Sequence, residues 1–248
     1  HFPDPSDPDL KWSGYSEPLT PDQRPDAPAA PTARFVKEQN GPANAGGVLH
    51  VTWTAPDVDG SAVHSYHVTV APPSGGSMTR TFGANVFTHA WDGLENGTAY
   101  SFTVVAENDA GKSDPSGSSE SIVPAGVPPQ VTSVQAQRVS DGRNDNGGLA
   151  TVTWSAASAN GDPAGLRYRV TSNPASGAPR ETTDTSIEWS GLSPTVSYSF
   201  TVVAFNKAGD GPPGVASNPV IAEGKPDAPA SPTFLPGDNA VQLAGITS

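Results

Sequence analysis

The sequence contains no cysteine, so no disulfide can hold its parts together. Small domains without disulfides depend on a packed hydrophobic core for their stability. A chain without thiols is compatible with any redox compartment, and no zinc-ligand spacing is present.

Basic residues are scarce. The chain has 13 Lys and Arg against 25 Asp and Glu, which gives a formal net charge of −12 at pH 7. Proteins bind nucleic-acid phosphates and anionic membrane surfaces mainly through clustered Lys and Arg, and no stretch of this chain is basic. Nor does any apolar run approach the roughly 18–20 residues of a membrane-spanning helix. The sequence therefore predicts no nucleic-acid partner and no membrane insertion.

Recognisable catalytic motifs are also missing, because the chain has neither a Gly-x-Ser-x-Gly turn nor a phosphate-binding loop. The histidines are scattered, and none has a carboxylate or a nucleophile at a recognisable catalytic spacing in the sequence. They are His1, His50, His64, His67 and His89. We therefore expect no enzyme activity, no catalytic residues and no cofactor.

What the sequence does contain is one stretch that occurs twice, at residues 97–111 and 195–209. In both copies large apolar residues recur at every second position, which is the period of a half-buried β-strand. Each copy ends in Asn-x-Ala-Gly, a combination typical of tight turns. The repeat predicts two β-domains of about 100 residues each.

The residues around each copy resemble the fibronectin type III domain. Each half has a Val-Thr-Trp segment (51–53 and 152–154), then a Tyr followed by aliphatic residues (66–70 and 168–170), then Gly-Leu before a Tyr (93–100 and 191–198). The resemblance implies an all-β fold of two tandem seven-stranded Greek-key β-sandwiches of the immunoglobulin-like, fibronectin type III class. The richness in Gly, Pro, Thr and Asp suits a bacterial or phage member of the family.

The same resemblance implies which side chains form the structural core, including a tyrosine corner in which a Leu and a Tyr lock the crossover before the sixth strand. The implied core residues are Trp53, Leu94, Tyr100, Trp154, Leu192 and Tyr198. Trp91 and Trp189 could instead form an exposed platform for carbohydrate, but each lies three residues before the Leu, and this position favours the core.

Recurring Pro-rich signals predict the domain boundaries. Pro-Asp-Ala-Pro occurs at 25–28 and again at 226–229, and such clusters mark domain starts. We expect residues 1–25 to be a Pro-rich arm or the end of a preceding repeat. Fibronectin type III domains then follow at 26–124 and 125–224, and 225–248 form a linker and the start of a third, incomplete repeat.

Two short motifs suggest ligands or modifications, but ordinary loops explain them better. Asp141 and Asp145 belong to an oxygen-rich cluster that could coordinate Ca²⁺, although it lacks the regular spacing of an EF-hand loop. Asn96 begins an Asn-Gly-Thr sequon for N-glycosylation, at a place where a plain turn is expected. We therefore expect no bound metal.

These observations favour a non-enzymatic repeat at the cell or virion surface, or otherwise secreted. It would act as a semi-rigid spacer or as an adhesion or protein-interaction module, with a protein or cell-surface glycan and further repeats of the same chain as partners. The alternative is a non-catalytic accessory segment of a secreted bacterial polysaccharide-degrading enzyme. The prolines at 124, 128 and 129 restrict the backbone between the two domains and favour the spacer.

Overall fold

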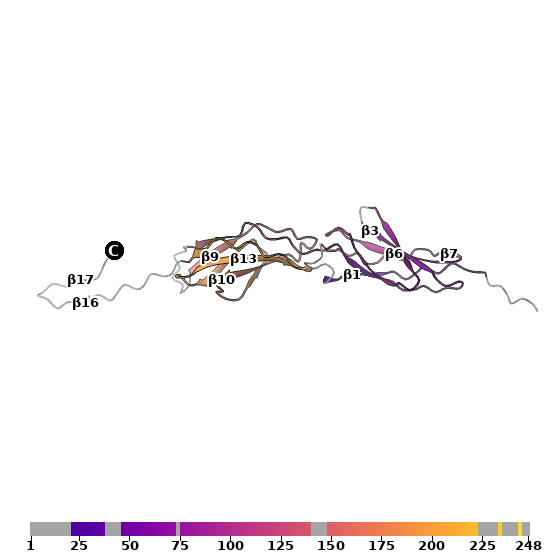
Figure 1. Ribbon diagram of the computed structural model, residues 1–248, viewed down its shortest axis with the longest axis horizontal. Helices are drawn as coiled ribbons and strands as arrows, with labels where there is room; N and C mark the ends of the chain where they lie inside the picture. The colour runs from indigo at the N-terminus through magenta and orange to yellow at the C-terminus, as the bar shows by residue number, and fades with distance from the viewer. Residues whose placement is uncertain are drawn as a thin grey trace, which may run out of the picture. The chain divides into compact units, whose positions relative to one another are not determined.

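The computed structural model describes residues 21–37, 46–72, 75–139 and 148–222, and two further strands at 233–234 and 243–244. Its architecture is all-β (Figure 1). Contacts between Cα atoms divide the chain into two compact units, His1–Gly126 and Val127–Ser248. Among the described residues, no helix is long and apolar enough to cross a membrane.

The first unit contains two antiparallel sheets with the strand orders β1-β2-β5 and β4-β3-β6-β7. The chain crosses between the two sheets three times, as in a Greek-key sandwich. The crossings lie between β2 and β3, between β4 and β5, and between β5 and β6. The strands are β1 (Thr32–Phe35), β2 (Leu49–Thr52), β3 (Ser65–Ala71), β4 (Met78–Gly83), β5 (Thr88–Trp91), β6 (Ser101–Asn108) and β7 (Gly111–Lys112).

The second unit repeats this arrangement, with the orders β12-β9-β8 and β11-β10-β13-β14. It has eight strands instead of the seven predicted, because its last strand is interrupted and its second part, β15, pairs with β13 separately. The strands are β8 (Gln135–Val139), β9 (Gly148–Thr153), β10 (Arg167–Asn173), β11 (Arg180–Thr182), β12 (Ser186–Leu192), β13 (Ser197–Asn206), β14 (Gly209–Asp210) and β15 (Val220–Ile221). A short hairpin follows, β16 (Thr233–Phe234) with β17 (Leu243–Ala244).

Each sandwich encloses a separate hydrophobic core, built from the residues that point inward at every second position. The six side chains that the sequence assigns to the core are all buried, and so are Trp91 and Trp189, which are 0% exposed. A fully buried indole cannot stack on a sugar, so the platform interpretation of these two tryptophans is wrong. The remaining buried aromatic side chains are Tyr66, Phe102, Tyr168 and Phe200.

The predicted tyrosine corner is present in both domains. The Tyr100 hydroxyl accepts a hydrogen bond from the Glu95 N–H (3.0 Å), and the Tyr198 hydroxyl accepts one from the Ser193 N–H (3.3 Å). Each bond joins the start of the sixth strand to the residue after the buried Leu. This fixes the connection between the two sheets.

The last strand of the first domain is interrupted by a ladder of three serines. The N–H groups of Ser113, Ser116 and Ser119 donate to carbonyls on β6 at every second residue, while the serines themselves are three residues apart. The strand with the serines therefore has three residues for every two of β6, and this mismatch leaves one β6 N–H per step without a backbone acceptor. The serine hydroxyl oxygen accepts that hydrogen bond at 2.9–3.0 Å. The ladder therefore fastens an irregular strand whose backbone alone would leave buried donors unsatisfied.

The second domain uses glycine at two of the three equivalent positions. Gly211, Gly214 and Ser217 donate to β13 as the serines do to β6, but a Cβ at Gly211 would lie 2.2 Å from the carbonyl oxygen of Pro128. A Cβ at Gly214 would likewise lie 3.0 Å from the oxygen of Val131. The backbone that leads into the second domain occupies the space that serine side chains fill in the first.

The segment before each domain is bonded to that domain. Both carboxylate oxygens of Asp22 accept hydrogen bonds from Ser61, in the loop between β2 and β3. Asn108, at the end of β6, donates to the carbonyls of Gln23 (2.7 Å) and Ser61 (3.0 Å). In the second domain Asn160 donates to the carbonyl of Val127 (2.8 Å). The first folded unit therefore includes residues 22 and 23, which precede the boundary expected at residue 26.

Candidate functional site

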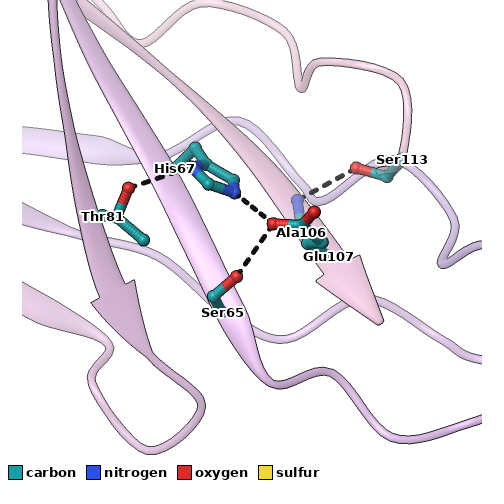
Figure 2. Close-up of polar contacts among 6 residues, drawn as sticks. All are labelled: Ser65, His67, Thr81, Ala106, Glu107 and Ser113. Atoms are coloured by element: carbon teal, nitrogen blue, oxygen red, sulfur yellow. Dashed lines mark hydrogen bonds and ion pairs between the residues drawn. The ribbon is translucent and has the colours of Figure 1, made fainter. Parts of the chain in front are cut away.

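The outward face of the β4-β3-β6-β7 sheet carries a connected group of polar side chains, which we call the His67 network: Ser65, His67, Thr81 and Glu107 (Figure 2). Strand alternation places them there. Tyr66, the residue between Ser65 and His67, points into the core, so its two neighbours point outward.

The pairing of the strands brings the members of the network together. His67 lies opposite Thr81 on β4, and Ser65 lies opposite Glu107 on β6. His67 Nδ1 is 3.0 Å from Thr81 Oγ1, and His67 Nε2 is 2.6 Å from Glu107 Oε2. The Ser65 hydroxyl donates to the same carboxylate oxygen at 3.2 Å. Figure 2 shows the imidazole between the threonine hydroxyl and the carboxylate.

The electrostatics of the network decide where its protons lie. The hydrogen bond from His67 lowers the pKa of Glu107, and Ser65 and the charge of Lys112 act in the same direction. An ionised carboxylate can only accept, so Nε2 of a neutral His67 carries the proton and Nδ1 accepts the hydrogen bond from the Thr81 hydroxyl. The order hydroxyl, imidazole, carboxylate is that of an activated nucleophile.

The equivalent place in the second domain has a different chemistry. Arg169 stands between Tyr168 and Val170 as His67 stands between Tyr66 and Val68. Its guanidinium binds Glu181 (3.0 Å) and Asp210 (2.8 Å) and lies 4.7 Å from the centre of the Phe205 ring. The two carboxylates raise the pKa of Arg169. Both domains thus cross-link this sheet face through a residue of the third strand, but only the first domain does so through an imidazole and a hydroxyl.

A second polar feature covers the buried tryptophans. Arg80 lies 4.7 Å from the ring centre of Trp91 and binds Asp92 at 2.8 Å. Arg180 lies 4.4 Å from the ring centre of Trp189 and donates to backbone carbonyls. Each arginine lies over the ring of a buried tryptophan, so both cation–π pairs have a structural role.

The other sequence candidates for ligand sites do not enter the network. Asp141 and Asp145 lie outside the described residues. No group of three or more His, Asp or Glu in the described part of the chain could hold a metal ion. The side-chain oxygen of Asn96 accepts a hydrogen bond from the Gly47 N–H (2.7 Å), so the residue that begins the sequon fastens a turn.

Sequence reasoning missed the His67 network because its members are far apart in the chain. His67 and Glu107 are separated by 40 residues and meet only through the pairing of β3 with β6. The available signal was the alternation of both strands, which places both side chains on the outward face. The register of the pairing, which sets their distance, cannot be read from either strand alone.

Comparison with known proteins agrees with this architecture. The family model described as "Fibronectin type III domain" matches residues 42–122 and 132–220. A comparison with curated protein sequences finds no relative of the chain.

Solved structures include several that are similar to the chain. The FN1–FN3 domains of chicken CNTN1 are 20% identical to it, with a TM-score of 0.38; the alignment covers 77% of this chain and 65% of that one. A two-domain fibronectin type-III segment of chicken tenascin is 18% identical, with a TM-score of 0.38, and the alignment covers 79% of this chain and all of the segment. The twitchin kinase region of C. elegans is 20% identical over 41% of this chain and 17% of that one, with a TM-score of 0.34. The chain thus spans about two thirds of the CNTN1 structure and a smaller share of the twitchin one.

Proposed function

Because this chain belongs to the fibronectin type III family, we propose that it is a non-enzymatic segment that acts as a semi-rigid spacer and offers its exposed sheet faces and loops to a partner. Domains of this family commonly serve as spacers or protein-interaction modules. The site of action is outside the cell or on a virion surface, and the partner is a protein or a cell-surface glycan.

The contacts of the linker carry the spacer proposal. On the side of the first domain, the Gly97 N–H donates to the carbonyl of Pro124 (3.0 Å), and Gly126 packs so closely on Gly46 that a Cβ there would lie 2.6 Å from the Gly126 Cα. On the side of the second domain, Asn160 binds the carbonyl of Val127. Gly126 and Val127 are consecutive, so the linker is bonded to one domain or the other on both sides of this peptide bond.

The composition of the linker supports the same proposal. Proline fixes φ near −65° and biases the preceding residue to extended geometry. With Pro124, Pro128 and Pro129 in a segment of six residues, few backbone torsions are free to change. A spacer needs this property, because a stiff linker transmits a defined separation.

The surfaces supply the interaction part of the proposal. Each domain presents an outward sheet face with charged and hydroxyl side chains, the His67 network in the first and the Arg169 cluster in the second. The net charge of −12 opposes binding to phosphates, and this supports a protein or a neutral glycan as the partner over a nucleic acid.

Small-angle scattering of the full chain tests the spacer. We expect the double substitution Pro128→Gly, Pro129→Gly to broaden the distribution of interatomic distances, because two fixed φ angles become free. The matched control is Pro115→Gly with Pro219→Gly, which removes two exposed prolines outside the linker and should leave the distribution unchanged. An unchanged distribution in the linker variant would contradict a role for these prolines in stiffness.

A further inference from the structure

We propose that Thr81 is an acyl-acceptor site, at which His67, oriented by Glu107, activates the threonine hydroxyl toward activated acyl esters. This modification site goes beyond the proposed spacer function and does not depend on it. It concerns one acyl transfer per chain and does not require turnover.

The geometry of the three side chains carries the proposal. A hydroxyl is a weak nucleophile until a base within hydrogen-bond reach removes its proton, and the base works best when a third group orients it. Thr81 Oγ1 is 3.0 Å from His67 Nδ1, and the other imidazole nitrogen is 2.6 Å from Glu107 Oε2. Hydroxyl, base and orienting carboxylate therefore stand in the required order.

The fixed position of the imidazole strengthens this assignment. Glu107 binds both His67 and Ser65 through the same oxygen, and the His67 side chain is only 17% exposed. The carboxylate holds the proton on Nε2 and stabilises the imidazolium that forms when Nδ1 takes the hydroxyl proton. Lys112 is the other charged group that acts on this carboxylate.

Access for the acyl donor comes from the position of Thr81 in the sheet. The residue is exposed, and β4 is an edge strand that pairs only with β3 among the described strands. An ester can therefore approach Oγ1 from solvent while the imidazole remains behind it. Figure 2 shows the hydroxyl at the end of the network, with His67 between it and Glu107.

The chemical step is a transesterification. Thr81 Oγ1 attacks the carbonyl carbon of the ester, and its proton passes to His67 Nδ1. The bond between that carbon and the leaving oxygen then breaks, and the leaving group departs as an alkoxide or phenolate that the proton neutralises. The products are a threonine ester and an alcohol or phenol, with no change in oxidation state.

The chain contains its own controls. Thr79 is exposed on the same strand and faces the same side, but its hydroxyl is hydrogen-bonded to Thr69 Oγ1 at 2.7 Å and not to an imidazole. In the second domain Arg169 and Glu181 occupy the places of His67 and Thr81, so that position has neither a hydroxyl nor an imidazole.

The test uses the full chain with p-nitrophenyl acetate near neutral pH, followed by peptide mapping with mass spectrometry. Hydroxylamine removes esters but leaves acetylated lysines intact, so it identifies ester formation on threonine. We expect acetylation at Thr81 to exceed that at Thr79 by on the order of tenfold or more, which is a modest effect for general-base catalysis. His67→Gln should reduce the ratio of Thr81 to Thr79 to about one, and Glu107→Gln should lower it several-fold through the loss of orientation.

An unfolded variant would also bring the ratio to about one, but it would do so by changing the Thr79 signal. Loss of the imidazole base in a folded variant should lower the Thr81 signal and leave the Thr79 signal at its level in the unsubstituted chain. Thr81→Val should remove the ester signal from its peptide. Equal acetylation of Thr79 and Thr81 in the unsubstituted chain would overturn the proposal. So would a ratio that His67→Gln leaves unchanged, because the imidazole would then have no part in the reaction.

Discussion

At the scale of single residues, the tyrosine corner shows how one hydrogen bond holds a crossover. Tyr100 is buried and its hydroxyl is the acceptor for the Glu95 N–H. Phe fills nearly the same volume without an acceptor, so Tyr100→Phe leaves this donor without its partner. We expect the first domain to lose about 1–3 kcal/mol of unfolding free energy, measured in a urea titration of the full chain by the amide NMR signals of that domain.

Tyr66→Phe is the matched control for this substitution. Tyr66 is buried in the same core, and among the described residues its hydroxyl makes no hydrogen bond to a backbone N–H. Its replacement should change the stability by less than that of Tyr100. If the two variants unfold at the same urea concentration as the unsubstituted chain, the corner contributes nothing measurable.

At the scale of elements, the segment before the first domain is fastened by a carboxylate. The backbone N–H of Ser61, and then its hydroxyl, lower the pKa of Asp22 because both donate to the ionised form. The sign follows directly: a carboxyl whose pKa is lower in the folded state stabilises the fold above its ordinary pKa, and this contribution disappears as the pH falls through the lowered value.

The pH dependence can be measured at the amide that donates. The chemical shift of the Ser61 amide should titrate with a midpoint below 3.8, the ordinary pKa of Asp, and Asp22→Asn should abolish that titration. Asp59→Asn removes an exposed carboxyl from the loop that contains Ser61 and should leave the midpoint of the Ser61 amide titration unchanged. A midpoint at or above 3.8 would mean that the bond to Ser61 does not form in solution.

At the scale of the whole molecule, the two domains have separate hydrophobic cores with no residue in common. A core of its own is what a domain needs to fold alone. We expect residues 21–126 and 127–222, produced separately, each to unfold in one cooperative transition in denaturant.

The segment before each domain makes this experiment sensitive to the boundary. A fragment of residues 26–124 lacks Asp22 and Gln23, which bind Ser61 and Asn108, and it lacks the buried Ala125. It should unfold at a lower denaturant concentration than residues 21–126. Equal midpoints for the two fragments would show that these contacts add no stability.

The sequence by itself determined the fold of this protein. Alternating apolar residues at 97–111 and 195–209 predict two half-buried strands. The tryptophans and tyrosines around them carry the resemblance to the fibronectin type III domain, and that resemblance implies the sandwich. The same resemblance implied the hydrogen bond of the tyrosine corner. These features are local or repeated, so they are visible along a single chain.

Only the tertiary structure decided what lies on the surface. His67, Thr81 and Glu107 come from three strands, and their distances depend on two strand registers that the alternation leaves open. The serine ladder could not be read from the sequence either. Serines that are three residues apart fit acceptors on β6 that are two residues apart, and this match is visible only when the two strands are paired. The fold follows from which residues are buried, while the candidate site follows from which exposed residues become neighbours.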